Sequence, residues 1–163
     1  MMLGAITTAN KIPSETSVFE PAMIAGCALA VIAALVAGVG FASHLVLRHI
    51  VQTLPLWFGV LLGIRRSRSA AWVSLPCFLF WLALMIMIWL YLLGMPSIVS
   101  GHFSPLEIAM TIIVGAASVI GIVAFVCLKS FLSGAKVIGI FIVFAIAQVL
   151  CFRLSFLPAI AHR

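Results

Sequence analysis

The sequence contains no aspartate and only three glutamates, and this scarcity limits the chemistry open to the protein. Acid–base catalysis and the binding of hard cations both depend on carboxylates, often on several of them together. Glu15 and Glu20 lie in the polar N-terminal stretch, so Glu107 is the only acidic residue in the rest of the chain. The composition therefore argues against an acid–base enzyme and against a calcium or magnesium site.

Cysteine and histidine are present, but not in the patterns of a known site. No CxxC pair, zinc-ligand spacing, HExxH motif or glycine-rich phosphate loop occurs. The expected membrane spans also lack the facing histidines that would ligate a haem in a helical bundle. We therefore expect no metal and no cofactor, and we interpret the protein as non-catalytic rather than as an enzyme. The four cysteines are expected to be free thiols in apolar surroundings: Cys27, Cys77, Cys127 and Cys151.

Apolar residues dominate what is present. Hydrophobic residues make up 66% of the 163 residues and charged residues only 7%, whereas about a quarter of a typical soluble domain is charged. The nine lysines and arginines lie mainly at the ends of apolar runs, where they act as topology signals and contact anionic phospholipids of the bilayer. We therefore expect a membrane protein that does not bind nucleic acid.

The lengths of the apolar runs predict an all-α integral membrane protein with four transmembrane helices plus a short interfacial or re-entrant helix. A helix needs about 20 residues to cross a bilayer, and four runs qualify: about 21–47, 70–94, 105–128 and 137–157. Residues 1–20 are expected to form an extramembrane tail, and residues 21–163 the four-helix transmembrane bundle. The remaining run, 53–64, is only about twelve residues long and has basic residues on both sides.

Orientation follows from the distribution of the basic residues, because cytoplasmic loops are enriched in lysine and arginine. The segments around Arg48 to Arg68 and around Lys129 and Lys136 hold six of the nine positive charges. Four spans with these segments inside predict a bacterial inner-membrane protein with both termini periplasmic. If the segment 53–64 crosses as well, there are five spans and the orientation has to be derived again.

A stripe of small residues predicts where the helices pack. The first span has a small residue at every fourth position: Ala22, Gly26, Ala30, Ala34, Gly38 and Ala42. Such a stripe lets another helix approach closely in a bilayer. The third span is also rich in small residues, including Gly115 and Gly121, so we expect these two spans to pack together and to bind protein partners in a hetero- or homo-oligomer. The second span is bulky and is expected to face lipid.

The polar residues within or beside the apolar runs are the candidate functional residues. Ser104, Pro105 and Glu107 form a helix-capping pattern, so we interpret Glu107 as a cap rather than a proton relay. Gln148 is expected to hydrogen-bond a neighbouring helix, with Thr111 and Ser118 as possible partners. The other candidates, as lipid-headgroup or polar sites, are His44, Arg48, His49, Arg65, Arg66, Arg68 and Arg153.

Three functions fit these features. The first is a non-catalytic accessory or scaffold subunit of a larger membrane complex, favoured by the small-residue stripe. The second is a small homo-oligomeric transporter or channel, whose pathway would need Gln148, Thr111 and Ser118 to converge. The third is a lipid-modifying enzyme at the membrane interface that uses His44, His49 and the arginines.

Overall fold

The computed structural model describes residues 16–95, 103–127 and 134–161, and the described part of the chain is helical, without a strand. Five helices are long and apolar enough to cross a membrane. The first of them consists of an α-helical part followed directly by a π-helical part. The elements are α1 (Thr16–Ala33), η1 (Ala34–Gly40), α2 (Val46–Ile64), α3 (Ser69–Leu92), α4 (Pro105–Cys127), α5 (Gly134–Leu154) and the short α6 (Pro158–Ala161).

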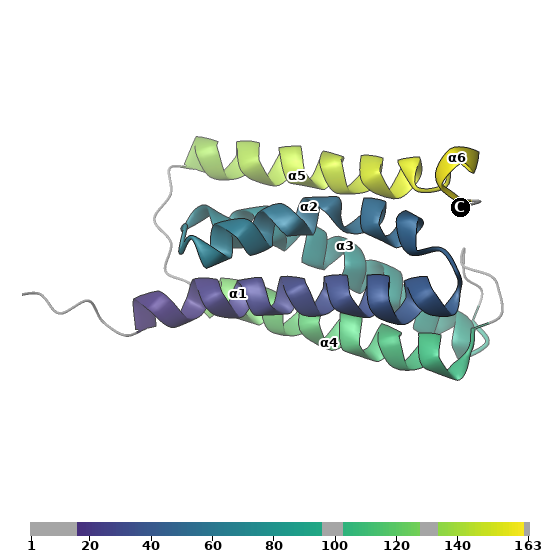
Figure 1. Cartoon of the computed structure of the whole chain (residues 1–163). Helices are drawn as coiled ribbons and strands as arrows, with labels where there is room; N and C mark the ends of the chain where they lie inside the picture. Colours follow the sequence, from purple (N-terminus) through teal and green to yellow (C-terminus); the bar gives the residue numbers. More distant parts are fainter. Residues whose placement is uncertain (1–15, 96–102, 128–133, 162–163) are drawn as a thin grey trace, which may run out of the picture.

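The long helices lie side by side and alternate in direction, so α1 begins at one end of the bundle and α5 finishes at the other (Figure 1). The turn between α2 and α3 carries Arg65, Arg66 and Arg68, and we call this end the arginine end. At the opposite end α2 begins, close to Arg48, and α4 begins, close to Glu107. We call this second end the pocket end.

The structure corrects the expected bounds of the first two apolar segments. The first helix starts at Thr16 and runs only to Gly40, not from residue 21 to 47. His44, in the left-handed region at φ 57°, lies in the turn that follows. The segment 53–64 is therefore not a separate short helix but the second half of α2, which has 19 residues. Arg48 and His49 do not separate two helical segments, because they lie in the first turn of α2.

With α2 counted, the described residues hold five candidate spans rather than four and a short interfacial helix. The mean hydropathy of α2 is 1.3, against 2.3 to 2.5 for the other four candidate spans. The polar residues in its first two turns lower this value. The other helices lie within a few residues of the expected ranges. Residues 1–15 of the expected tail, His102, Lys129 and Arg163 are outside the described residues.

α3 lies at the centre of the bundle, and the expectation that its bulky side chains face lipid was wrong. It contacts α1, α2, α4 and α5, and Phe78, Trp81 and Met85 are buried. Small residues on its neighbours make room for these large ones: a side chain at Gly121 of α4 would collide with the ring of Phe78. Bulk alone does not indicate a lipid-facing helix, because a large side chain fits wherever a neighbour has a glycine.

The small-residue stripe divides into a buried part and an exposed part. Ala34 and Gly38 are buried, and a side chain at Gly38 would collide with Met110 of α4. The other positions of the stripe are partly or fully exposed: Ala22, Gly26, Ala30 and Ala42. α1 packs against α4, and it packs against α2 as well. On α4, Gly115 lies against Met85 of α3, with 3.9 Å between an ideal Cβ and the Met85 Cβ.

α5 lies at the outside of the bundle and packs against α2 and α3. Its only buried residue is Gln148. The rest of the helix exposes large aliphatic side chains such as Ile142, Val143 and Ile146. This composition suits a helix surrounded by lipid on most of its circumference.

Candidate functional site

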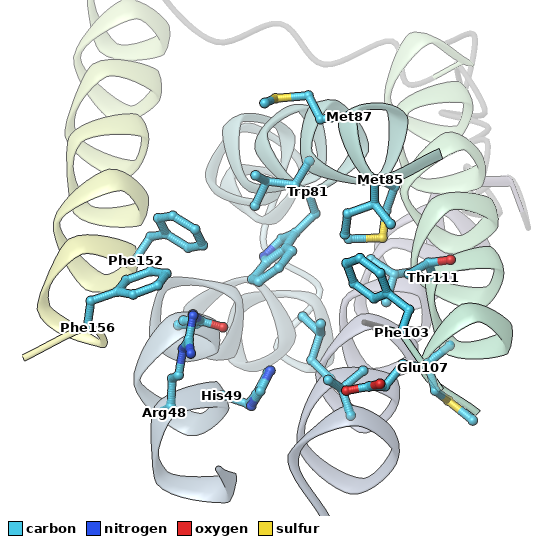
Figure 2. A pocket seen from close by; sticks show the side chains of 17 residues that line it. Arg48, His49, Trp81, Met85, Met87, Phe103, Glu107, Thr111, Phe152 and Phe156 are labelled. Atoms are coloured by element: carbon cyan, nitrogen blue, oxygen red, sulfur yellow. The ribbon is translucent and has the colours of Figure 1, made fainter. Parts of the chain in front are cut away.

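A cavity of about 550 Å³ opens among the helices at the pocket end (Figure 2). A volume of this size is typical of a small-molecule site. All five long helices contribute to its lining, because η1 continues α1. The lining residues are Leu35, Val39, Arg48, His49, Gln52, Trp81, Leu84, Met85, Met87, Ile88, Phe103, Glu107, Met110, Thr111, Val114, Phe152 and Phe156.

The lining is mostly apolar, with a few polar groups at defined places. Figure 2 shows Arg48 and His49 rising from α2, Phe152 and Phe156 lying beside Arg48, and Glu107 on the opposite wall. The ring centroids of Phe152 and Phe156 are 5.1 Å apart, in an edge-to-face arrangement. Trp81 and Met85 reach the cavity from α3. The site thus combines polar groups near the helix ends with an apolar, aromatic interior.

Arg48 is partly buried and stacks on an aromatic ring. Its Cζ lies 4.0 Å from the ring centroid of Phe156, a cation–π contact. Its Nε is buried and has no hydrogen-bond partner in the part of the chain that the structure describes. The aromatic ring covers one face of the guanidinium, but it cannot accept the in-plane N–H bonds that a carboxylate or phosphate accepts.

His49 is buried and fixed by its own helix. Its Nδ1 lies 2.9 Å from the carbonyl oxygen of Leu45. Because a carbonyl only accepts, Nδ1 carries a proton in this arrangement, and in the neutral imidazole Nε2 is then an acceptor. Figure 2 shows the imidazole facing the Glu107 carboxylate across the cavity. The ring therefore has one nitrogen engaged and the other available to a ligand.

A hydrogen-bonded chain holds α5 against α2 at the cavity wall. Gln52 Nε2 donates to Ser155 Oγ at 2.9 Å, and Ser155 Oγ donates to the Phe152 carbonyl at 2.6 Å. Gln148 Nε2 donates to the backbone carbonyl of Gln52 at 3.0 Å. This confirms that Gln148 bonds a neighbouring helix, but the partner is α2 and not Thr111 or Ser118 on α4. These bonds position Phe152 and Phe156 beside Arg48.

Glu107 caps α4, as the sequence pattern predicts. The Ser104 backbone N–H and the Ser104 hydroxyl both donate to Glu107 Oε2 at 2.8 Å. In return the Glu107 backbone N–H donates to Ser104 Oγ at 3.3 Å. The reciprocal bonds confirm the capping box. The same carboxylate lines the cavity, so it has a second environment that the sequence pattern does not reveal.

The remaining sequence candidates do not gather at this site. His44 is exposed in the turn after η1, and Arg153 is exposed in the last turn of α5. Arg65, Arg66 and Arg68 are exposed at the arginine end. Sixteen residues of helix separate His49 from Arg65, which corresponds to about 24 Å. Among the described residues, the arginines of the α2–α3 turn are therefore not assembled with His49 into one interfacial centre.

Several cavity residues were missed from the sequence. Trp81 and Gln52 lie within apolar runs, where an isolated tryptophan or glutamine gives no signal of function. Thr111 was expected as a hydrogen-bond partner of Gln148 or as part of a transport pathway. Its hydroxyl instead donates to the Ile108 carbonyl at 2.7 Å. The useful signal was the pair Arg48 and Gln52, one helical turn apart on the same face of α2.

Among the described residues no three His, Cys, Asp or Glu side chains gather in one place. Cys27 and Cys77 are buried free thiols, whereas Cys127 is exposed. Comparisons of the chain with protein-family models, with curated proteins and with solved structures found no match.

Proposed function

We propose that the protein is a non-catalytic, five-span membrane protein that binds an amphipathic molecule in the cavity at the pocket end. The observation that carries this proposal is the composition of the cavity. Its α3 wall presents Leu84, Met85 and Ile88, which suit a hydrocarbon chain, and its α2 wall presents the polar groups Arg48 and His49. A cavity with one apolar and one polar region matches a ligand with a tail and a headgroup.

The bonds within the site support binding rather than catalysis. The Glu107 carboxylate is engaged in the cap of α4, and Gln52 is engaged with Ser155. These groups hold the walls in place, and no nucleophile in the described lining is paired with a base. A preorganised cavity of this kind binds a ligand without large rearrangement of the helices.

The proposed topology places the arginine end in the cytoplasm. Arg65, Arg66, Arg68 and Lys136 lie at this end, whereas Arg48 and Arg153 lie at the pocket end. The positive-inside rule then favours a cytoplasmic N-terminus and, after five crossings, a C-terminus outside. In a bacterial inner membrane, the cavity would lie in the periplasmic half of the bilayer and the exposed arginines would contact anionic phospholipids.

Analysis of co-purified molecules tests the binding proposal. Ile88→Trp would fill the cavity from α3, and Ile86→Trp is its matched control, because Ile86 is 52% exposed and does not line the cavity. Each variant is purified in a mild detergent and extracted with solvent, and the extracted amphiphiles are quantified by mass spectrometry. The wild type and Ile86→Trp should retain one amphiphile in a fixed ratio to protein, and Ile88→Trp should lose it. Equal retention by all three, or no retained amphiphile in the wild type, would contradict the proposal.

A second candidate function is that of an accessory subunit in a larger membrane complex. The exposed part of the small-residue stripe supports it, because a side chain at Gly26 would meet no atom of the described chain within 4 Å. Gly26 and Ala30 lie in a shallow apolar groove with Ala116 of α4, where another helix could approach closely. Native mass spectrometry after mild extraction tests this candidate. A protein that always appears as a single chain would exclude it.

A further inference from the structure

We propose that the amphiphile carries an anionic oxygen headgroup, a phosphate or a carboxylate, that accepts hydrogen bonds from Arg48 and Trp81. This inference rests on the proposed binding function and specifies the chemistry of its ligand. It depends on two residues that line the same cavity, each of which carries a buried N–H group without a partner in the described structure.

Arg48 supplies the charge. Arg48 is only partly buried, but its Nε is buried without an acceptor among the described residues, and a desolvated N–H of a charged group is costly unless an acceptor pairs with it. Glu107, the only acidic residue of the lining, is on the opposite wall and in the cap of α4. Phe156 covers one face of the guanidinium, and an aromatic ring in that position does not accept the in-plane N–H of Nε. An anionic oxygen from a ligand would accept that bond.

Trp81 supplies a neutral donor deeper in the cavity. Its side chain is 3% exposed, and its Nε1 is buried without a partner. The indole nitrogen is a donor only, so it needs an acceptor, and an apolar ligand would leave it unsatisfied. Figure 2 shows Trp81 pointing from α3 into the centre of the cavity, on the side of Arg48 and Phe152. One oxygen-bearing headgroup between these walls would satisfy both donors.

The rest of the cavity positions the headgroup and the tail. The negative charge of Glu107 repels an anion from its wall, which favours the Arg48 side. Leu84, Met85 and Ile88 extend the cavity along α3 with apolar surface, where a hydrocarbon chain would lie. A phospholipid and a fatty acid share this chemistry, because each joins an anionic oxygen group to an apolar chain.

Equilibrium binding of defined probes tests the headgroup. The purified protein in a neutral detergent is titrated with oleate, dioleoyl phosphatidate, oleyl alcohol and inorganic phosphate. At least one of the two anionic amphiphiles should bind about tenfold or more tightly than oleyl alcohol, as expected for a charge-assisted hydrogen bond. Oleate alone would identify a carboxylate source, and phosphatidate alone a phospholipid source. Binding of inorganic phosphate as tightly as either amphiphile would overturn the need for a tail.

Three variants complete the test. Arg48→Gln should lower the affinity for the anionic amphiphile about tenfold and leave the affinity for oleyl alcohol unchanged. Trp81→Phe should lower the affinity for the anionic amphiphile by a smaller factor. Arg153→Gln removes an exposed cation from the same end of the bundle and should change neither affinity.

If oleyl alcohol binds as tightly as the anions, or if Arg48→Gln and Trp81→Phe preserve the preference for anions, the headgroup proposal is wrong while amphiphile binding stands. If no amphiphile binds, the proposed function itself fails.

Discussion

The two ends of the bundle are built in different ways. At the arginine end, glycines bring the helices together: Gly59 of α2 faces Ser74 of α3, and Gly63 faces Ala25 and the Pro21 carbonyl of α1. At the pocket end the same helices carry Arg48, Trp81 and other large side chains. There the bundle encloses about 550 Å³ that the described side chains do not fill.

This difference shows how a small membrane bundle can keep a cavity and still be a defined structure. Lipid provides little hydrophobic driving force between helices, so close packing of small residues holds them together. The glycine contacts of α2 at the arginine end bring α1, α2 and α3 together, whereas Gly38 at the pocket end packs against Met110 of α4. At the pocket end side chains of unequal size leave a space between the helices. We infer that the glycine contacts at the arginine end stabilise the packing of α1, α2 and α3 and that the pocket end carries the binding chemistry.

The sharpest test of the comparison is whether the two ends lie in different compartments. In a Cys-free background, Ser67→Cys reports on the arginine end and Ala159→Cys on the pocket end. With five crossings, a membrane-impermeant thiol reagent added to intact cells should label Ala159→Cys and not Ser67→Cys. Permeabilised cells are the control, in which both positions should react. Labelling of both positions, or of neither, in intact cells would mean an even number of crossings between them. It would contradict the proposal that the cavity lies in the periplasmic half of the bilayer.

The next largest effect is expected from a side chain placed in the packed end. In Gly63→Ala the new Cβ would lie 2.6 Å from the Cβ of Ala25 and 2.8 Å from the Pro21 carbonyl oxygen. Since part of this obstacle is backbone, we expect a loss of about 1–3 kcal/mol in stability. Gly26→Ala is the matched control in α1, because nothing lies within 4 Å of its Cβ. It should be neutral or stabilising by up to about 1 kcal/mol through helix propensity.

Thermal unfolding of the two glycine variants in the same detergent gives the measurement. A clear drop in the midpoint for Gly63→Ala and none for Gly26→Ala would support glycine packing at the arginine end. Equal midpoints of thermal unfolding for the two variants would show that the contact at Gly63 contributes little to stability. Glycine packing would then not distinguish the arginine end from the pocket end.

The sequence predicted the helical membrane class, the capping box of α4 and the interhelical bond of Gln148. Each of these depends on local pattern or on one residue in a strongly apolar run. The start of α2 was predicted incorrectly, because Arg48 and His49 look like a membrane boundary when the cavity that surrounds them is unknown. In a bilayer a polar side chain can lie within a span if it faces the protein interior.

The cavity was beyond what the sequence alone predicts. Its lining comes from every long helix, so no spacing along the chain relates Arg48 to Trp81 or Phe156. The position of α3 shows the same limit. α3 and α5 have mean hydropathies of 2.3 and 2.5, yet one lies at the centre and the other at the outside. Hydropathy measures transfer from water to an apolar phase, and in a bilayer lipid and protein interior are both apolar.

A smaller effect is expected from Gln148, which ties α5 to the pocket end. Gln148→Leu removes the 3.0 Å bond to the Gln52 carbonyl, and interhelical bonds of this kind contribute about 1 kcal/mol or less. Hydrogen exchange should increase in the last turns of α5 and stay unchanged in the α2–α3 turn. Val149→Leu, at a position that is 48% exposed, is the control and should change neither region. Faster exchange at both ends would mean that α5 supports the whole bundle and not the cavity wall alone.

The smallest effect is expected at the capping box, at the edge of the cavity. Ser104→Ala removes the hydroxyl that accepts from the Glu107 N–H, and loss of an N-cap costs about 1 kcal/mol. Glu107→Gln keeps an oxygen that can accept from the Ser104 N–H, so it should cost less. Amide exchange in the first turn of α4 measures both losses. If Glu107→Gln costs more than Ser104→Ala, the charge of Glu107 stabilises something other than the cap. The described candidate is His49, which faces Glu107 across the cavity in Figure 2, and the pocket end would then hold a pair of interacting charges rather than a single cation awaiting an anionic ligand.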